Sequence, residues 1–182
     1  MIEAAAREDL EEAAGDAVRF DVPMSRFTSL GVGGPVDAMV TPDDRSALAR
    51  VLRICALHRL PHAVIGKGFN SIVRDEGLTG VALRLSRFRD LGVRPGEFLR
   101  SESGVSHHQI TRFCQAQGLA GLEFGAGIPG TVGGWIAMNA GIGTRELKDV
   151  VRELEVMSPT GARISHLERP LLRFGYRALR GL

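Results

Sequence analysis

The segment from residue 125 to residue 141, GAGIPGTVGGWIAMNAG, is glycine-rich and carries no charged side chain. Its apolar residues, including Trp135, place it inside a folded domain and not in a polar linker. Glycines allow positive φ values and let main-chain N–H groups approach a ligand closely, and phosphate is the ligand that such loops most often bind. Tight packing of the bare backbone against a neighbouring element is an equal alternative.

Composition limits the classes of protein to which the chain can belong. It has 182 residues, a net charge of +2 and 44% hydrophobic residues, which suits one globular domain or two small subdomains. The basic residues are scattered, so we expect neither a nucleic-acid partner nor a membrane partner. The acidic, alanine-rich start has no leader pattern, and we expect a cytoplasmic protein.

The cysteine and histidine residues show neither a disulfide pattern nor a metal-ligand pattern. Cys55 and Cys114 each fall on the apolar side of an expected helix, which favours buried, reduced thiols. The five histidines lack metal-ligand spacing, and we expect no metal site.

Helices and strands are mixed along the chain without a regular alternation. We expect a helix over 41–58, capped by Thr41 and stopped by Pro61, and a second helix capped by Ser106 and ended by Gly118 that buries Ile110, Phe113 and Cys114. Residues 62–85 read as strand, glycine loop, short strand, turn and strand. Hairpins are expected at Pro95-Gly96 and around 159–161.

Two nucleotide-binding motifs fail when they are placed on these elements. GAGIPG at 125–130 is a literal G-x-G-x-x-G with Glu146 about twenty residues further on, but no strand precedes it and Gly133 and Gly134 weaken the helix that it should open. GKGFNS at 66–71 lacks the order of a P-loop and runs into a strand. Two separate glycine-rich loops suit a large dinucleotide held between two α+β subdomains.

Four segments in order resemble the UDP-N-acetylenolpyruvoylglucosamine reductase (MurB) family of peptidoglycan synthesis: RFTSLGVGGPVD, VIGKGFNSIVRDEGLTGVALRL, GLEFGAGIPGTVGGWIAMNAG and FGYR. The resemblance implies an α+β fold with two FAD-binding subdomains of the vanillyl-alcohol oxidase and p-cresol methylhydroxylase type. It also implies an NADPH-dependent flavin oxidoreductase that reduces UDP-N-acetylglucosamine enolpyruvate to UDP-N-acetylmuramate. FAD is the cofactor that it implies, and the enzyme is expected to be a monomer.

The resemblance also implies roles for individual residues. Arg177 would stabilise the enolate that forms when hydride reaches the double bond, and Tyr176 would orient Arg177 or the substrate. The alternative for FGYR is an aromatic anchor beside a surface arginine. The expected FAD-binding residues are Gly66, Gly68, Phe69, Asn70, Ser71, Ile72, Gly127, Ile128, Pro129, Gly130, Val132, Gly133, Gly134 and Asn139. For Asn139, a plain place at a helix C-terminus is an equal alternative.

Departures from the family pattern are part of the prediction. Phe69 stands where the family usually has serine, which removes a hydroxyl from the expected diphosphate site, and Leu179 also replaces a serine. We expect an N-terminal extension over 1–22, FAD-binding subdomains over 23–86 and 87–182, and no substrate domain, so that the fold is C-terminally truncated and the chain is inactive without it. A flavin-binding module without reductase activity and, less favoured, an NAD(P)-binding Rossmann domain remain alternatives.

Overall fold

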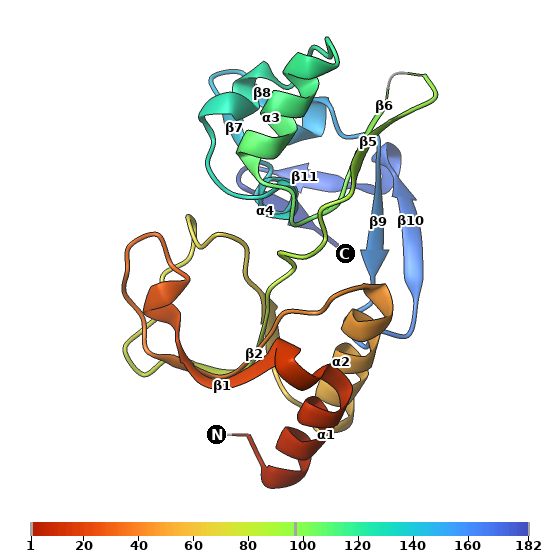
Figure 1. Ribbon diagram of the computed structural model, residues 1–182. Helices are drawn as coiled ribbons and strands as arrows, with labels where there is room; N and C mark the ends of the chain where they lie inside the picture. The colour runs from red at the N-terminus through yellow and green to blue at the C-terminus, as the bar shows by residue number, and fades with distance from the viewer. Residues whose placement is uncertain (1, 97, 182) are drawn as a thin grey trace. The chain divides into compact units, whose positions relative to one another are not determined.

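The computed structural model describes residues 2–96 and 98–181 (Figure 1). The chain forms two compact units. Unit 1 contains residues up to Arg87 together with 157–164, and unit 2 contains Phe88–Val156 and the residues from Ser165 onward. Unit 1 thus includes the N-terminal segment that the sequence assigns to a separate extension.

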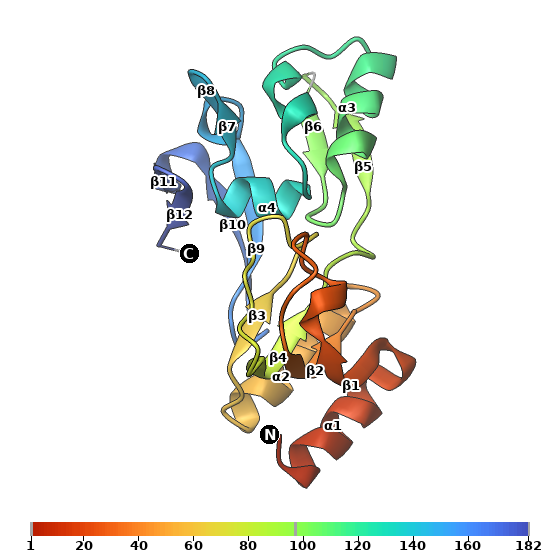
Figure 2. The ribbon, with the colours of Figure 1, turned by 90° about the vertical axis from the view of Figure 1, so that its left-hand side faces the viewer.

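A four-stranded sheet is the centre of unit 1. Its strands, in the order β1-β2-β4-β3, are Val18–Pro23, Pro35–Val40, Leu78–Leu83 and His62–Val64. β1 pairs antiparallel with β2, whereas β4 pairs parallel with both β2 and β3. The labels follow this order across the lower part of Figure 2. Because the chain crosses from β2 to β3 through a helix, the parallel strands are those expected of a β-α-β connection.

Two helices pack together in unit 1, α1 at Ala4–Ala14 and α2 at Arg45–Leu57. Figures 1 and 2 show both on one side of the sheet. The predicted start of α2 at Thr41 is wrong, because the side chain of Asp44 accepts the hydrogen bond from the Ala47 N–H at 2.7 Å and so caps the helix. The four buried α2 residues follow the helical period, and they are Leu48, Val51, Leu52 and Cys55.

Unit 2 is built from short elements. Its helices are α3 at His107–Ala116 and α4 at Val132–Ala137, with 3-10 turns η3 at Glu123–Gly127, η4 at Leu147–Asp149 and η5 at Arg169–Leu171. Its strands form two-stranded sheets: β5 Leu91–Arg94 with β6 Phe98–Ser101, β7 Gly141–Ile142 with β8 Arg145–Glu146, β9 Glu153–Met157 with β10 Ile164–Glu168, and β11 Arg173–Gly175 with β12 Ala178–Arg180. The two predicted hairpins, β5–β6 and β9–β10, are confirmed.

The core of unit 2 lies around Trp135, whose side chain is 2% exposed. Helix α3 begins with a capping box of Ser106 and Gln109, as the sequence predicts for Ser106, and it buries Ile110 and Cys114. Phe113 is only half-buried, against the prediction. The core therefore holds α3, α4 and the loops between them as one packed body.

The predicted short strand after the first glycine loop is absent. Residues 71–74 form no strand. Val73 instead packs into the core, and the carbonyl oxygen of Arg74 accepts hydrogen bonds from the N–H groups of Gly34 and Gly77 at 2.9 and 3.0 Å. Burial and loop contacts thus replace the strand pairing that the β-branched residues suggested. No helix among the described residues is long and apolar enough to cross a bilayer.

Candidate functional site

Most main-chain donors of the loop from Gly66 to Ile72 in unit 1 have no acceptor in the described part of the chain. Within residues 2–96 and 98–181, no acceptor takes a hydrogen bond from the N–H groups of Gly66, Lys67, Gly68, Phe69, Ser71 or Ile72. Gly68 has a φ of 69°, in the left-handed region. Successive open N–H groups around a left-handed residue form the concave nest that binds anions. The structure thus supports the predicted role of this loop as a phosphate-binding segment.

Gly68 is fixed in place by the neighbouring turn. The main-chain N–H of Ser29 donates to the carbonyl oxygen of Gly68 at 3.1 Å. A Cβ at position 68 would lie 2.7 Å from the Cα of Thr28, closer than real atoms approach. Glycine is therefore required at this position by both the backbone conformation and the packing.

Apolar side chains border the open donors. Phe69 is 52% exposed and Ile72 is 80% exposed, and the adjoining loop exposes Leu30 at 64% and Val32 at 47%. Exposed apolar groups beside an anion-binding loop suit a ligand that carries both phosphate and an apolar ring system.

Several glycines of the second loop, in unit 2, serve packing and not a ligand. A Cβ at Gly125 would lie 2.8 Å from Cη2 of Trp135, and one at Gly133 would lie 2.8 Å from Cβ of Ser103. The Trp135 Nε1–H donates to the carbonyl oxygen of Ile128 at 3.2 Å. The close packing at Gly125 and Gly133 agrees with the packing alternative stated for this loop.

The N–H groups at the start of α4 already donate hydrogen bonds to acceptors within unit 2. Those of Val132 and Gly133 donate to the carbonyl oxygens of Val105 and Ser103, each at 2.9 Å, and that of Gly134 donates to Oγ1 of Thr131 at 3.4 Å. These three N–H groups are therefore not open to a diphosphate, and the place of Val132, Gly133 and Gly134 in the FAD site stays a prediction.

Fewer donors of the second loop remain for a ligand. The Ile128 N–H donates to the Gly125 carbonyl at 3.0 Å, Pro129 has no N–H, and Gly127 ends the turn η3. In the described part of the chain, the N–H groups of Gly130 and Thr131 have no acceptor, and Gly130 has a φ of 124°. The capacity of this loop to bind an anion is thus concentrated at these two residues.

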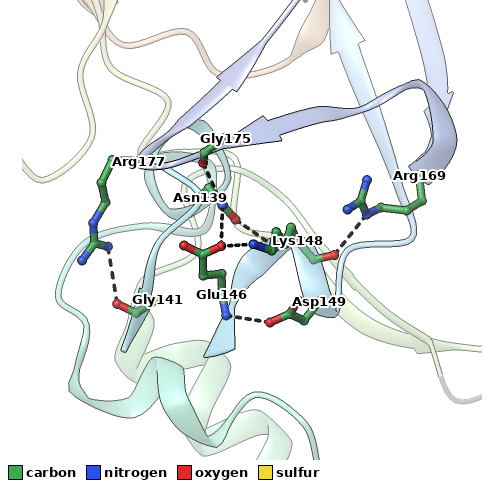
Figure 3. Close-up of polar contacts among 8 residues, drawn as sticks. All are labelled: Asn139, Gly141, Glu146, Lys148, Asp149, Arg169, Gly175 and Arg177. Atoms are coloured by element: carbon green, nitrogen blue, oxygen red, sulfur yellow. Dashed lines mark hydrogen bonds and ion pairs between the residues drawn. The ribbon is translucent and has the colours of Figure 1, made fainter. Parts of the chain in front are cut away.

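Asn139 has a structural role in unit 2, and its predicted contact with the cofactor stays a prediction. Its side chain is completely buried. Nδ2 donates to Oε2 of Glu146 at 3.1 Å and to the Gly175 carbonyl at 3.0 Å, and Oδ1 accepts from the Lys148 N–H at 3.0 Å (Figure 3). With both amide protons committed, Asn139 has no donor for FAD. It follows the end of α4, which agrees with the alternative stated for it.

Tyr176 and Arg177 form the turn of the β11–β12 hairpin. Tyr176 is 84% exposed. Arg177 has a φ of 51°, and its Nη1 donates to the Gly141 carbonyl at 3.4 Å (Figure 3). An arginine in the left-handed region is unfavourable, and such strain accumulates at functional sites. The guanidinium is exposed, so it is available to a ligand.

One ion pair and both cysteines have pKa values shifted from their ordinary values. The hydrogen bond from Lys148 holds the pKa of Glu146 below its ordinary value, and the same bond raises the pKa of Lys148. Burial raises the pKa of the Cys55 thiol to about 11 and, together with the charge of Glu123, raises that of Cys114. Both cysteines are buried thiols, as the sequence predicts, and neither is a nucleophile at neutral pH. No group of three or more His, Cys, Asp or Glu residues in the described ranges could hold a metal ion.

Sequence reasoning missed the polar network around Asn139. Its members are Asn139, Glu146, Lys148 and Arg169, and their carbonyl partners are Lys148, Leu172 and Gly175. The one signal in the sequence is an asparagine directly after a helix, because asparagine tolerates the left-handed conformation that Asn139 adopts with a φ of 41°. Residue spacing could not predict that Asn139 bonds to Gly175, because the two residues are 36 positions apart in the sequence.

The FAD binding domain family matches residues 35–165. The chain is 40% identical over 173 residues to UDP-N-acetylenolpyruvoylglucosamine reductase of Geotalea uraniireducens, covering 95% of this chain and 57% of the relative. It is 41% identical over 169 residues to the reductase of Geobacter metallireducens, covering 93% and 55%. The chain thus spans a little over half the length of the curated relatives that it matches.

Solved structures agree with this assignment. The reductase (MurB) of Thermus caldophilus superposes with a TM-score of 0.74 and 28% identity, covering 89% of this chain and 57% of that one. A flavoprotein of the vanillyl-alcohol oxidase type from Myceliophthora thermophila superposes with a TM-score of 0.67 at 10% identity, covering 91% and 42%. The second likeness shows the fold alone, and it confirms the predicted α+β fold. The chain therefore belongs to the family of FAD-binding domains, with FAD as the cofactor of that family, and it resembles the UDP-N-acetylenolpyruvoylglucosamine reductases over most of its own length.

Proposed function

We propose that this chain is the FAD-binding part of an NADPH-dependent reductase that converts UDP-N-acetylglucosamine enolpyruvate to UDP-N-acetylmuramate. The open N–H groups of Gly66, Lys67, Gly68, Phe69, Ser71 and Ile72 are the observation that carries the proposal. A diphosphate needs several hydrogen-bond donors at once. This loop offers several main-chain N–H groups that no acceptor in the described ranges takes. The names of the relatives supply the substrate class.

Each part of the proposed site has a separate task. The N–H groups of Gly66, Lys67, Gly68, Phe69, Ser71 and Ile72 would hold the diphosphate. Unit 2 has open N–H groups of its own at Gly130 and Thr131. Ile72, which is 80% exposed, would cover an apolar part of the cofactor and exclude water from it. FAD, when bound, supplies hydride transfer.

Arg177 and Tyr176 are proposed to act on the substrate. Hydride transfer to an enolpyruvyl double bond leaves negative charge on the substrate. A positioned guanidinium stabilises such charge as it develops, which is worth about 10²–10³-fold in rate at a comparable site. The exposed Arg177 can fill this role, and Tyr176 would orient the guanidinium or the substrate. We further propose that the enzyme works as a monomer in the cytoplasm.

The test uses the product of the complete reading frame that contains this chain, purified and loaded with FAD. We expect NADPH oxidation to require UDP-N-acetylglucosamine enolpyruvate and to yield its lactyl ether. Arg177→Ala should lower kcat by about 10²–10³-fold with a smaller change in KM. Arg173→Ala, which removes another exposed arginine of the same hairpin, is the control and should keep wild-type kcat.

Two results would contradict parts of the proposal. If the rate of NADPH oxidation does not depend on the enolpyruvyl sugar, the protein binds FAD but does not reduce this substrate. That result would favour the alternative of a flavin-binding module. An unchanged kcat in the Arg177→Ala protein would show that the guanidinium does not stabilise the transition state.

A further inference from the structure

We propose that buried Asn139 is a positioning residue that holds the Tyr176–Arg177 turn through the carbonyl oxygen of Gly175. Gly175 is the last residue of β11 and precedes the turn directly. The inference rests on the proposed function only for the use that is made of Arg177.

Asn139 is connected to three segments of unit 2 at once. It follows α4, its Nδ2 donates to both Gly175 and Glu146, and its Oδ1 accepts from Lys148 (Figure 3). Its side chain is 0% exposed, so each of these bonds is protected from competition by water. A buried amide with three partners fixes the place of the Gly175 carbonyl.

Arg169 provides a second connection to the same hairpin. Its Nε donates to the Lys148 carbonyl at 3.1 Å, and its Nη1 donates to the Leu172 carbonyl at 3.1 Å. Leu172 directly precedes β11 and is 4% exposed. Asn139 through Gly175, and Arg169 through Leu172, thus connect both ends of β11 to the 146–149 segment.

The turn needs such external support. Arg177 lies in the left-handed region, which favours glycine over arginine in a two-residue hairpin turn. A strained conformation persists only when its surroundings determine it. Two hydrogen bonds hold the turn in this conformation. Asn139 donates to the carbonyl oxygen of Gly175 before the turn, and Arg177 Nη1 donates to the carbonyl oxygen of Gly141 after α4.

The test measures the turn itself in the purified chain. Asn139→Gly removes the amide but suits the positive φ of this position. We expect amide hydrogens of β11 and β12 to exchange about tenfold faster, whereas those of β5 and β6 in the same unit stay within about twofold of wild type. Tyr176 is the only tyrosine, so a fluorotyrosine label should report a narrower ¹⁹F line from a freer turn.

Glu146→Gln is the matched control. It removes the charge beside Asn139 but leaves the bond from Asn139 to Gly175, so exchange in β11 and β12 should stay within about twofold of wild type. Because neither readout needs FAD or substrate, the result is independent of the proposed function. In the reductase assay described above, Asn139→Gly should lower kcat more than it changes KM.

Three outcomes would overturn the inference: unchanged exchange in β11 and β12, equal acceleration in β5 and β6, or the same effect from Glu146→Gln. If Asn139→Gly does not fold, wild-type nuclear Overhauser contacts decide. Contacts between the Asn139 Nδ2 protons and the Gly175 Hα protons support the inference, and their absence overturns it.

Discussion

The main-chain N–H of Ser29 donates to the carbonyl oxygen of Gly68 at 3.1 Å. This bond connects the glycine loop of unit 1 to the preceding turn through an acceptor of the loop, while the N–H groups of Gly66, Lys67, Gly68, Phe69, Ser71 and Ile72 stay open in the described part of the chain. The loop is therefore preorganised for an anion, which lowers the entropy cost of binding.

Gly68→Ala should disrupt this preorganised loop. A Cβ there would lie 2.7 Å from Thr28 Cα, and the φ of 69° disfavours alanine. We expect FAD affinity to fall at least about tenfold and unfolding free energy to fall by about 1–3 kcal/mol. Flavin fluorescence titration and urea unfolding measure the two effects. Gly92→Ala is the control, since Gly92 has open space and no positive φ; equal losses in both variants would refute a special role of Gly68.

Gly130→Val should abolish FAD binding. The reason is conformational, because the φ of 124° penalises a β-branched residue although a Cβ there would come no closer than 3.9 Å to Trp135. Gly134→Ala is the matched control, because its N–H is donated within the chain and alanine favours a helix by about 1 kcal/mol. A Gly130→Val protein that purifies yellow with normal affinity would show that this loop does not bind the diphosphate.

Phe69→Ser should tighten FAD binding. The substitution returns a hydroxyl to the open loop, and one hydrogen bond contributes about 0.5–1.5 kcal/mol. Phe69 is 52% exposed, so its loss leaves the core intact. Unchanged or weaker binding by calorimetry would mean that the aromatic ring itself packs on the cofactor.

Glu146 should contribute stability that depends on pH. Its pKa lies below the ordinary value of 4.5 because of the hydrogen bond from Lys148, so the folded state binds fewer protons than the unfolded state. Its contribution is complete above pH 4.5 and is lost as the pH falls through the lower folded-state value. Wild type should therefore melt at a higher temperature than Glu146→Gln at pH 7. The difference should shrink as the pH falls below 4.5 and Glu146 becomes protonated in the folded state. A difference that does not change with pH would contradict this prediction.

Local patterns were sufficient for the elements whose signals are short-range. The hairpin at Pro95-Gly96 and the cap at Ser106 depend on neighbouring residues, and both are found. The start of α2 was misplaced because Thr41 and Asp44 are both suitable caps, and only the hydrogen bond to Ala47 distinguishes them.

The candidate site could be predicted only where the chemistry lies in the main chain of one loop. The N–H groups of Gly66, Gly68 and Ser71 have no acceptor in the described part of the chain, as expected of phosphate-binding donors. In the second loop, Val105 and Ser103 take the N–H groups of Val132 and Gly133, and this pairing comes from a segment almost thirty residues earlier. The structural role of Asn139 could not be predicted for the same reason, because its partner Gly175 is 36 residues away.

Equilibrium binding of FAD tests the central claim most directly. The purified chain, titrated with FAD, should show a shifted flavin absorption band. Its melting temperature should also rise, since free ligand at one hundred times Kd adds about 2.7 kcal/mol of stability. NADP⁺ at the same concentration should stabilise the chain much less. A chain that stays colourless and gains no stability from excess FAD, or that is stabilised by NADP⁺ instead, would contradict the account.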